Sequence, residues 1–239
     1  MELYTMQQLL KNNAYPGRGI VLGLTPDGEK SVAAYFIMGR SANSRNRIFS
    51  AEPDGIRTQA YDPAKMEDPH LIIYHPVREW ESRLIVTNGD QTDTIRDHLA
   101  VGKCFADALR TRCFEDDAPN FTPRISGLLQ RSGSYKMSIL KAGDGEGTAC
   151  VRYFYEYPGT PGQGHFIHTY VCDGNPLPPF EGEPKGVQIP QKIDDFATEI
   201  WENLDENNKI SLFVRYTDIK TGAAEQRIIN KHQGGLYND

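Results

Sequence analysis

Residues 18–38 read RGIVLGLTPDGEKSVAAYFIM, and this stretch decides which fold class is expected. Residues 18–24 and 31–38 are both mostly apolar and have the length of a buried strand. Between them, Thr25-Pro26-Asp27-Gly28 places proline and glycine where a β-turn needs them. Two strands joined by such a turn form a hairpin, so the sequence predicts antiparallel β structure near its start.

The rest of the chain continues this succession of strands with few helices between them. Further strands are expected at 71–74, 83–87, 123–129, 135–141, 150–157, 165–172, 210–218 and 224–231. Helices are expected at 2–13, at 92–113 with a break near Gly102, and at 193–207. Because strands mostly follow one another, the order predicts an α+β protein with large antiparallel sheets. The Pro- and Gly-rich loop at 173–190 is the one candidate boundary, yet strand-forming sequence on both sides favours a single domain over 1–239.

Composition excludes several classes of protein. The chain has 239 residues, a formal net charge of −6 and 38% hydrophobic residues, which suits an acidic globular protein with a sizeable core. No basic face is evident, so a nucleic-acid partner is not expected. The sequence has no run of 18 apolar residues and no secretory leader, which predicts a cytoplasmic protein without a membrane partner.

Cysteine and histidine spacing gives no sign of a metal site or of disulfide bonds. Cys104, Cys113, Cys150 and Cys172 form no CxxC pair, so four reduced and mostly buried thiols are expected. The six histidines are scattered, and His165 and His168 fall on opposite faces of an expected strand. The sequence therefore predicts no bound metal. The glycine-rich fingerprints of ATP hydrolysis and of dehydrogenases are absent as well.

The polar stretch that follows the first hairpin is the first candidate for a ligand site. Residues 39–47 read GRSANSRNR and carry three arginines among small polar side chains. Guanidinium groups suit phosphate and carboxylate oxygens, so in an acidic protein this concentration indicates an anion site. The alternative is a solvated loop whose arginines pair with surface acids.

Two further polar segments lie where expected strands begin or end. Residues 87–95 (TNGDQTDTI) join a strand to a helix, where Thr92 or Asp93 is expected to cap the helix and free N–H groups attract anions. A capping turn without a ligand is the alternative. Residues 122–125 (TPRI) are a short element start with one charge.

Together these segments resemble the archaeal-type IMP cyclohydrolases. The family's Tyr-x-Gly-Arg start is matched by Tyr15-Pro16-Gly17-Arg18, and its Arg-Ser and Asn-Arg loop by Arg40-Ser41 and Asn46-Arg47. Its Ser/Thr-Asn-Gly-x-x-Thr-Asp-Thr-Ile segment is matched by residues 87–95, and its Thr-Pro-Arg-Ile motif by residues 122–125. The resemblance covers residues 15–125, leaving 1–14 as an N-terminal extension and the part beyond about 130 unmatched.

This resemblance implies both a fold and a reaction. The fold is a four-layer αββα sandwich like that of the N-terminal nucleophile hydrolases. The reaction closes the purine ring of 5-formamidoimidazole-4-carboxamide ribotide to give IMP and water in purine biosynthesis. It implies a purine nucleotide as the small-molecule partner and no cofactor. A homo-oligomer is expected only because such assemblies are common among metabolic enzymes.

The resulting hypothesis assigns a role to each matching residue. Arg18, Arg40 and Arg47 bind phosphate or orient the substrate, while Tyr74 donates to the developing oxyanion. Arg124 assists either task, and Glu115, Asp116 or Asp117 accepts a proton. The expected catalytic residues are Tyr74, Arg47, Asp93 and Arg124. The expected substrate-binding residues are Arg18, Arg40, Ser41, Asn46, Asn88, Gly89, Thr92, Thr94 and Thr122.

Two other functions stay open from the sequence. One is a nucleotide-binding protein that has lost turnover. The other is an amide hydrolase of the N-terminal nucleophile type, which requires self-cleavage to expose a nucleophile such as Thr5 or Ser31. The cyclohydrolase hypothesis itself requires the arginines to converge around the polar turn that precedes Thr92.

Overall fold

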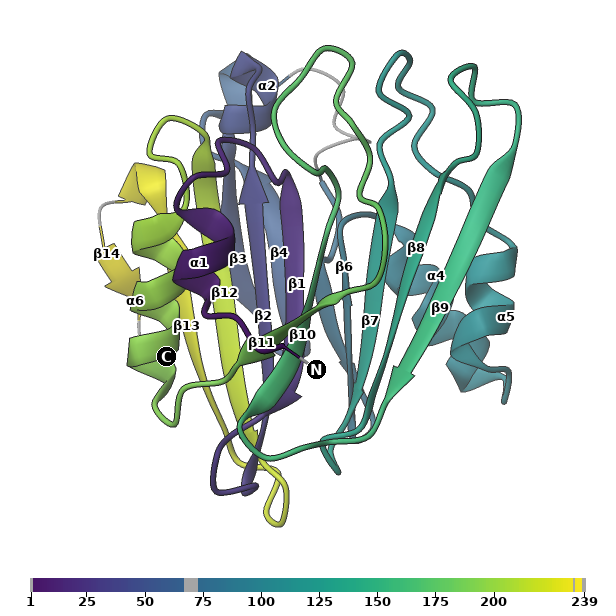
Figure 1. Cartoon of the computed structure of the whole chain (residues 1–239). Coiled ribbons are helices and arrows are strands. Elements are labelled where there is room, and N and C mark those ends of the chain that lie inside the picture. The colour runs from purple at the N-terminus through teal and green to yellow at the C-terminus, as the bar shows by residue number, and fades with distance from the viewer. Residues whose placement is uncertain (1, 67–72, 234, 238–239) are drawn as a thin grey trace.

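Two antiparallel β-sheets form the body of the protein (Figure 1). The computed structural model describes residues 2–66, 73–233 and 235–237. Within them, the first sheet has seven strands in the order β11-β10-β1-β2-β12-β13-β14. Its strands are β1 (Arg18–Leu24), β2 (Lys30–Met38), β10 (Gln163–His168), β11 (Lys185–Gln188), β12 (Lys209–Asp218), β13 (Ala224–Asn230) and β14 (Gly235–Tyr237). This sheet therefore combines strands from both ends of the chain.

The second sheet is built from one continuous part of the sequence. It also has seven strands, and they lie in chain order from β3 to β9. They are β3 (Arg47–Glu52), β4 (Gly55–Ala60), β5 (Val77–Trp80), β6 (Arg83–Thr87), β7 (Arg124–Gln130), β8 (Tyr135–Ala142) and β9 (Cys150–Tyr157). Every pair in both sheets is antiparallel.

Helices cover the outer faces of both sheets (Figure 1). The helices α1 (Met6–Leu10) and α6 (Ile193–Asn203) pack on the first sheet, and their apolar side chains share a core with Val21 and Phe36. The helices α4 (Gln91–Ala100) and α5 (Phe105–Arg110) pack on the second sheet. Short helical turns α2 (Ala42–Arg45), η1 (Pro63–Lys65) and η2 (Lys231–Gln233) lie in connections.

Strand alternation decides which side chains enter the space between the sheets. On β2, Tyr35 and Ile37 belong to the core between the sheets, whereas Ala34 and Phe36 face the helices. Neighbouring side chains on a strand point to opposite faces, so both faces of this central strand are buried. The layers are thus helices, sheet, sheet and helices, with one apolar core at each of the three interfaces.

The structure confirms the expected α+β class and most expected elements. The hairpin that residues 18–38 predicted is present as β1 and β2, and residues 135–157 form the expected strand pair β8 and β9. The long helix expected at 92–113 is broken into α4 and α5 around Gly102, whose φ is 76°. Such a positive φ ends a right-handed helix, and glycine adopts it without strain.

Other expectations were wrong. The helix expected at 2–13 is only the five-residue α1, and β11 lies within the expected loop at 173–190. The stretch after Met38 contains the unpredicted α2 and β3, and β4 and β5 were also missed. The strand expected at 71–74 falls partly on residues 71–72, which lie outside the described residues, and residues 73–74 are not in a strand.

The cysteines are free but not mostly buried. Cys104, Cys113 and Cys172 are exposed, and Cys150 is partly buried. Cys104 is the N-cap residue that precedes α5, and Cys113 and Cys172 lie in connections, which explains why they stay accessible to solvent. In the described part of the chain, no three His, Cys, Asp or Glu side chains are grouped to hold a metal ion. None of the helices described is long and apolar enough to cross a membrane.

Candidate functional site

Two arginines at the same end of the sheets point into the space between them. Arg18 begins β1 and Arg47 begins β3. Arg18 has the strand parity of Ile20, and Arg47 that of Phe49, and both apolar residues belong to the inter-sheet core. The alternation of side chains therefore directs both guanidinium groups inward from opposite sheets.

Arg47 is a buried cation with spare hydrogen-bonding capacity. Arg47 is 1% exposed, and its Nε donates to the Ser44 carbonyl at 2.8 Å. Burial and the neighbouring positive charge of Arg18 lower its pKa. Its Nη1 has no hydrogen-bond partner among the described residues. Since buried donors are nearly always paired, this N–H group is available to an anionic ligand.

Arg18 completes the cationic pair and is balanced by an acid. Burial works to lower its pKa, but the nearby Glu115 carboxylate and the tyrosines around it outweigh burial and raise it. Its Nε, too, is buried and without a partner in the described structure. The two arginines therefore offer unused N–H groups in one enclosed region, which is the arrangement that a phosphate or carboxylate requires.

Two phenols stand beside the arginines. The hydroxyl groups of Tyr35 and Tyr74 are 2.9 Å apart, and both residues are buried. Thr58 fixes the backbone of Tyr74, because its Oγ1 accepts from the Tyr74 N–H at 2.8 Å. Burial, and then contact with Tyr74, raise the pKa of Tyr35 well above its ordinary value. Tyr35 is therefore a neutral hydrogen-bond donor near neutral pH.

The connection after α5 supplies the acid of the site. Glu115 lies within electrostatic range of Arg18, Arg124 and Arg47, yet burial raises its pKa above the usual value for glutamate. Its backbone N–H donates to the Thr122 carbonyl at 2.9 Å. A carboxyl group with a raised pKa beside fixed cations is suited to accept and return a proton.

Thr122 anchors this acidic connection to the first sheet. Its N–H and its hydroxyl donate to the two carboxylate oxygens of Asp117 at 2.6 and 2.5 Å. Its hydroxyl is also 2.5 Å from the Tyr170 hydroxyl, and burial raises the pKa of Tyr170 to about 12. Thr122 thus holds the segment that carries Glu115 against the residues that follow β10.

The polar turn before α4 uses most of its groups to hold itself together. Asn88 donates to the Pro123 carbonyl at 2.8 Å and accepts from the Ile125 N–H at 2.9 Å, so it ties β6 to β7. The Thr87 and Thr92 hydroxyls lie 2.5 Å apart. The predicted cap at Thr92 or Asp93 was wrong, because α4 begins after Asp90 and no side chain caps it.

Arg124 and Gly89 meet at this turn. The Arg124 Nη1 donates to Asp90 at 2.8 Å and to the Gln91 side chain at 2.7 Å. A Cβ atom added at Gly89 would lie 2.4 Å from that nitrogen. Glycine at position 89 therefore gives the guanidinium group the room to lie against the turn, close enough to influence Glu115.

Arg40 lies at the edge of this cluster. Its Nη1 donates to Asp173 at 2.6 Å and to the Gly174 carbonyl at 2.8 Å. The guanidinium also lies 5.2 Å from the ring centre of Tyr15, which stacks on Tyr170. Arg40 therefore connects the site to the loop after β10, whose role the sequence left open.

The remaining predicted residues lie in other local structures. Ser41 caps α2 by accepting from the Ser44 N–H at 3.1 Å. Asn46 exchanges two hydrogen bonds with the Asp62 backbone, at 2.7 and 2.8 Å. Asp93 pairs with Arg78 at 2.8 Å and with Arg96 at 3.3 Å. Thr94 is partly buried on α4, and its carbonyl contacts His98.

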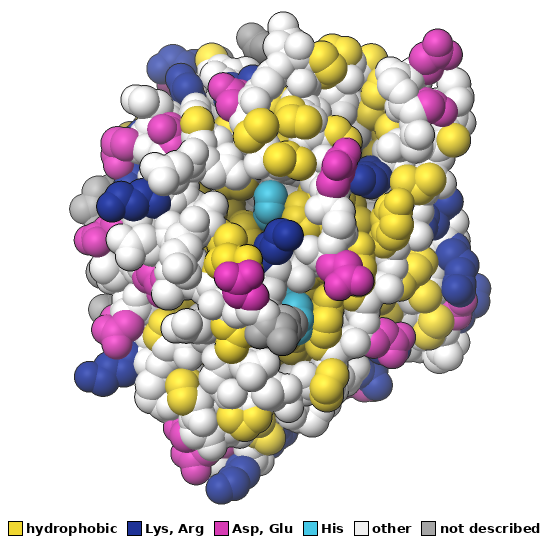
Figure 2. Space-filling view, in the orientation of Figure 1, with side chains coloured by type: hydrophobic (Ala, Val, Ile, Leu, Met, Phe, Trp, Pro, Cys, Tyr) yellow, Lys and Arg dark blue, Asp and Glu magenta, His cyan; other side chains and the backbone are white. Residues whose placement is uncertain are grey.

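Sequence reasoning named Tyr74 but missed Tyr35 and Tyr170 as functional candidates. Tyr35 is hidden in an apolar strand, where an inward phenol has no distinguishing pattern. Tyr170 follows β10, far from the matched motifs in sequence. The loop beyond it also covers one open side of the sandwich, where Phe180 is buried and Tyr155 donates to the Gly182 carbonyl at 3.1 Å. Figure 2 shows hydrophobic side chains gathered over this face.

Comparison with known proteins agrees with the segments described above. The family model described as IMP cyclohydrolase-like protein matches residues 15–222. A Methanococcus aeolicus protein named IMP cyclohydrolase is 28% identical over 162 residues, which span 66% of this chain and 75% of that protein. A Methanopyrus kandleri protein of the same name is 30% identical over 185 residues, 70% of this chain and 89% of its own length.

Other relatives match over a shorter part. A Methanococcus maripaludis protein, also named IMP cyclohydrolase, is 35% identical over 128 residues, so the chain spans 61% of its length. The family model reaches well beyond residue 125, where the recognisable motifs end, and includes β7 to β12. With the model matching most of its residues, the chain belongs to the IMP cyclohydrolase-like family.

Proposed function

We propose that this protein is an IMP cyclohydrolase that closes the ring of 5-formamidoimidazole-4-carboxamide ribotide to give IMP and water. The observation that carries the proposal is the pair of enclosed arginines, Arg18 and Arg47, with unpaired N–H groups beside Glu115. Membership in the family supports the choice of reaction, since the relatives carry the name IMP cyclohydrolase. The ligand would be a single purine nucleotide.

The reaction needs orientation and proton transfer more than it needs a strong nucleophile. The carboxamide nitrogen and the formyl carbon are on the same imidazole ring, so fixing the reactive rotamer makes attack unimolecular. Arg18 anchors the phosphate or orients the substrate from the floor of the site. Arg40 lies at its rim, where release from Asp173 would free it to contact the ribotide.

Two proton transfers complete the reaction. When the carboxamide nitrogen bonds to the formyl carbon, Glu115 takes one proton from that nitrogen and delivers it to the former formyl oxygen. The Tyr74 hydroxyl and Arg47 stabilise the negative charge that develops on this oxygen. Glu115 then takes the proton of the former formamido nitrogen and delivers it to the hydroxyl, so that water leaves and the new C=N bond forms.

The layer order supports a finer statement about the fold. Helices, two packed antiparallel sheets and helices are the layers of an N-terminal nucleophile hydrolase, and we include that likeness in the proposal. The positions of the two candidate nucleophiles disfavour an amide hydrolase that cleaves itself. Thr5 caps α1, and Ser31 pairs with Leu24 at the end of β1 opposite Arg18.

A spectrophotometric assay with the formylated ribotide tests the proposal. The purified protein should convert it to IMP, and Arg47→Gln should reduce kcat/KM severely. The matched control Arg110→Gln, whose side chain is 62% exposed on α5, should keep the wild-type rate. IMP binding without ring closure by the wild-type protein would contradict the proposal and favour a binding protein instead.

A further inference from the structure

A cavity lies at the opposite end of the sandwich from the candidate site. It has a volume of about 230 Å³. Ser31 at the start of β2, the β5–β6 turn, the β7–β8 turn and the β12–β13 turn surround it. Both sheets therefore contribute to its walls, and none of its lining residues belongs to the arginine and Glu115 cluster.

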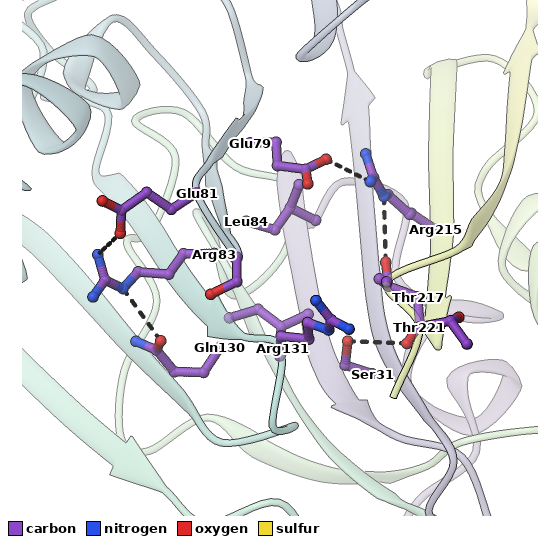
Figure 3. A pocket seen from close by; sticks show the side chains of 13 residues that line it. Ser31, Glu79, Glu81, Arg83, Leu84, Gln130, Arg131, Arg215, Thr217 and Thr221 are labelled. Atoms are coloured by element: carbon purple, nitrogen blue, oxygen red, sulfur yellow. Dashed lines mark hydrogen bonds and ion pairs between the residues drawn. The ribbon is translucent and has the colours of Figure 1, made fainter. Parts of the chain in front are cut away.

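Three arginines line this cavity, and two of them have carboxylate partners. Arg215 donates to Glu79 at 2.6 Å, and Arg83 donates to Glu81 at 3.2 Å (Figure 3). Arg131 has no carboxylate within ion-pair distance in the described part of the chain. The charged groups of the lining are thus three cations and two anions, which leaves one positive charge uncompensated.

Local structure holds the Arg131 guanidinium in place. Its Nε donates to the Ile219 carbonyl at 2.9 Å, and its Nη2 donates to the Lys220 carbonyl. Gly222, with φ of 80°, lets the turn close over it, because a Cβ atom there would lie 3.2 Å from the guanidinium carbon. The two carbonyls take the Nε and Nη2 groups, and among the described residues the Nη1 makes no hydrogen bond, which leaves it able to donate to a ligand in the cavity that Arg131 lines.

Hydroxyl groups surround the same space. Ser31, Thr217 near the end of β12 and Thr221 in the β12–β13 turn line the cavity together with Arg131 and Arg215 (Figure 3). Thr217 accepts from the Arg215 Nε at 3.3 Å, and Ser31 makes a long contact of 3.4 Å to the Thr217 carbonyl. A fixed guanidinium beside short hydroxyl side chains is the donor set that recognises phosphate oxygens.

We propose that this cavity is a second anion site, which binds a phosphate group through Arg131. The excess positive charge selects an anion, and the cavity has room for a phosphate together with a few additional atoms. The phosphate comes either from the free ion or from a small phosphate ester, and binding experiments distinguish these sources. The proposal is independent of the cyclohydrolase reaction, because it uses residues at the other end of the sheets.

Calorimetric titration with inorganic phosphate and with ribose 5-phosphate tests this site. Because the nucleotide site is expected to bind phosphate through Arg18, the titrations use Arg18→Gln as the background. In that background phosphate should still bind, and adding Arg131→Gln should weaken binding at least ten-fold. Tighter binding of ribose 5-phosphate than of phosphate would identify an ester as the ligand, and equal binding would identify the free ion.

Control variants keep the test decisive. Arg110→Gln in the same background should leave the phosphate affinity unchanged, since that side chain is exposed on α5. If the Arg131→Gln protein fails to fold, Arg83→Gln replaces it, because its loss removes one cation from the lining and should weaken binding several-fold. Unchanged affinity in a folded Arg131→Gln or Arg83→Gln protein, or no phosphate binding in the Arg18→Gln background, would overturn the proposal.

Discussion

Arg47 keeps a positive charge where almost no solvent reaches it. Replacing Arg47 with glutamine removes a buried cation whose pKa is already lowered by burial and by the charge of Arg18. The substitution should therefore not destabilise the fold. We expect Arg47→Gln to lower kcat/KM on the order of 100-fold or more, because the developing oxyanion loses a fixed donor. Steady-state kinetics with the formylated ribotide measures the loss, and thermal unfolding should show a Tm equal to or above that of the wild type.

The raised pKa of Glu115 predicts how the rate of the reaction depends on pH. Since burial raises its pKa, the carboxylate needed to accept a proton disappears at a higher pH than an ordinary glutamate would require. Activity should fall as the pH drops through that raised pKa, and Glu115→Gln should be slow at every pH and lack the acidic limb. A pH profile of kcat/KM measures both effects.

The neighbouring Asp116 provides the matched control for that profile. It is exposed, so Asp116→Asn should keep the wild-type acidic limb and the wild-type rate. An acidic limb that persists unchanged in Glu115→Gln would assign the titration to another group.

Residue type and strand position together decided which site residues the sequence could reveal. Arg18 and Arg47 stand in recognisable motifs at strand starts, where alternation alone fixes the side on which they lie. Asp93 illustrates the limit: it follows the buried Thr92, but one step along a helix rotates it toward Arg78. The orientation of α4 about its own axis depends on packing against the second sheet, which no short motif contains.

At the scale of elements, one asparagine joins the two sheets. Asn230 at the end of β13 accepts from the Phe49 N–H at 2.8 Å and donates to the Phe49 carbonyl at 2.9 Å, so it pairs with β3 as a strand would. Asn230→Ala would leave both groups of Phe49 buried without partners. We expect the free energy of unfolding to fall by about 3 kcal/mol, measured by urea denaturation.

A surface asparagine provides the control for this substitution. Asn207 is exposed in the turn after α6, and Asn207→Ala should change the free energy of unfolding by less than about 0.5 kcal/mol. Equal stability of Asn230→Ala and the wild type would show that the two sheets do not depend on this bridge.

A substitution in the turn between β6 and α4 should reduce activity although it changes no reacting group. In Gly89→Ala the new methyl group would lie 2.4 Å from the Arg124 Nη1 and 2.7 Å from the Gln91 Oε1, so the guanidinium must move. We expect kcat/KM to fall roughly 10- to 100-fold, because small displacements at a site that orients substrate are costly. Kinetics of the folded variant, checked by circular dichroism, measures this.

Another glycine separates the local clash from the general effect of a methyl group. Gly145 has no atom within 4 Å of an added Cβ, so Gly145→Ala should retain full activity. Wild-type kinetics in Gly89→Ala would remove Arg124 from the machinery of the reaction.

Elements with uniform apolar patterning were predictable, and those with mixed patterning were not. Residues 18–38 are buried on both faces, so their apolar runs indicate strands directly. In β3 the inward positions hold Arg47 and Phe49, so a buried cation interrupts the alternation that would have revealed the strand. Strand β5 has only four residues, too few for a period to be recognised.

At the scale of the whole molecule, buried histidines make stability depend on pH. Burial lowers the pKa of His165 to about 4, where its ring stacks on Tyr157 and its Nδ1 lies 2.7 Å from the Tyr135 hydroxyl. The unfolded chain binds a proton near pH 6.5, whereas the folded protein resists protonation until about pH 4. The stability is therefore complete above pH 6.5 and falls as the pH drops from 6.5 to 4, by about 3 kcal/mol for this group.

Denaturation at pH 7 and at pH 4.5 measures the contribution of His165. His165→Asn keeps a partner for the Tyr135 hydroxyl but does not titrate, so its stability should decline less between the two pH values. His98, which contacts the Thr94 carbonyl on α4, serves as the control, and His98→Asn should decline as the wild type does. Identical declines in all three proteins would exclude His165 as a source of the acid sensitivity.

The overall class was readable from the order of elements, but the pairing of distant strands was not. Successive strands predicted antiparallel sheets, and the second sheet follows that rule strand by strand. The first sheet does not, because β1 pairs with β10 and β2 with β12. Such pairings depend on the mutual fit of two cores, to which residues far apart in sequence contribute.

The first sheet takes its strands from before and after the segment that forms the second sheet, and this order affects how the chain folds. Each of the strands β3 to β9 pairs with the strand next to it in sequence, so the entropy lost in closing the loops is small. We therefore expect the amides of the second sheet to become protected from hydrogen exchange early in folding. The central hairpin β1–β2 is synthesised before the other described strands, yet both its edges stay unpaired until β10 and β12 have been made. During synthesis these two apolar strands therefore have unpaired edges for a time, and in this interval aggregation would compete with folding.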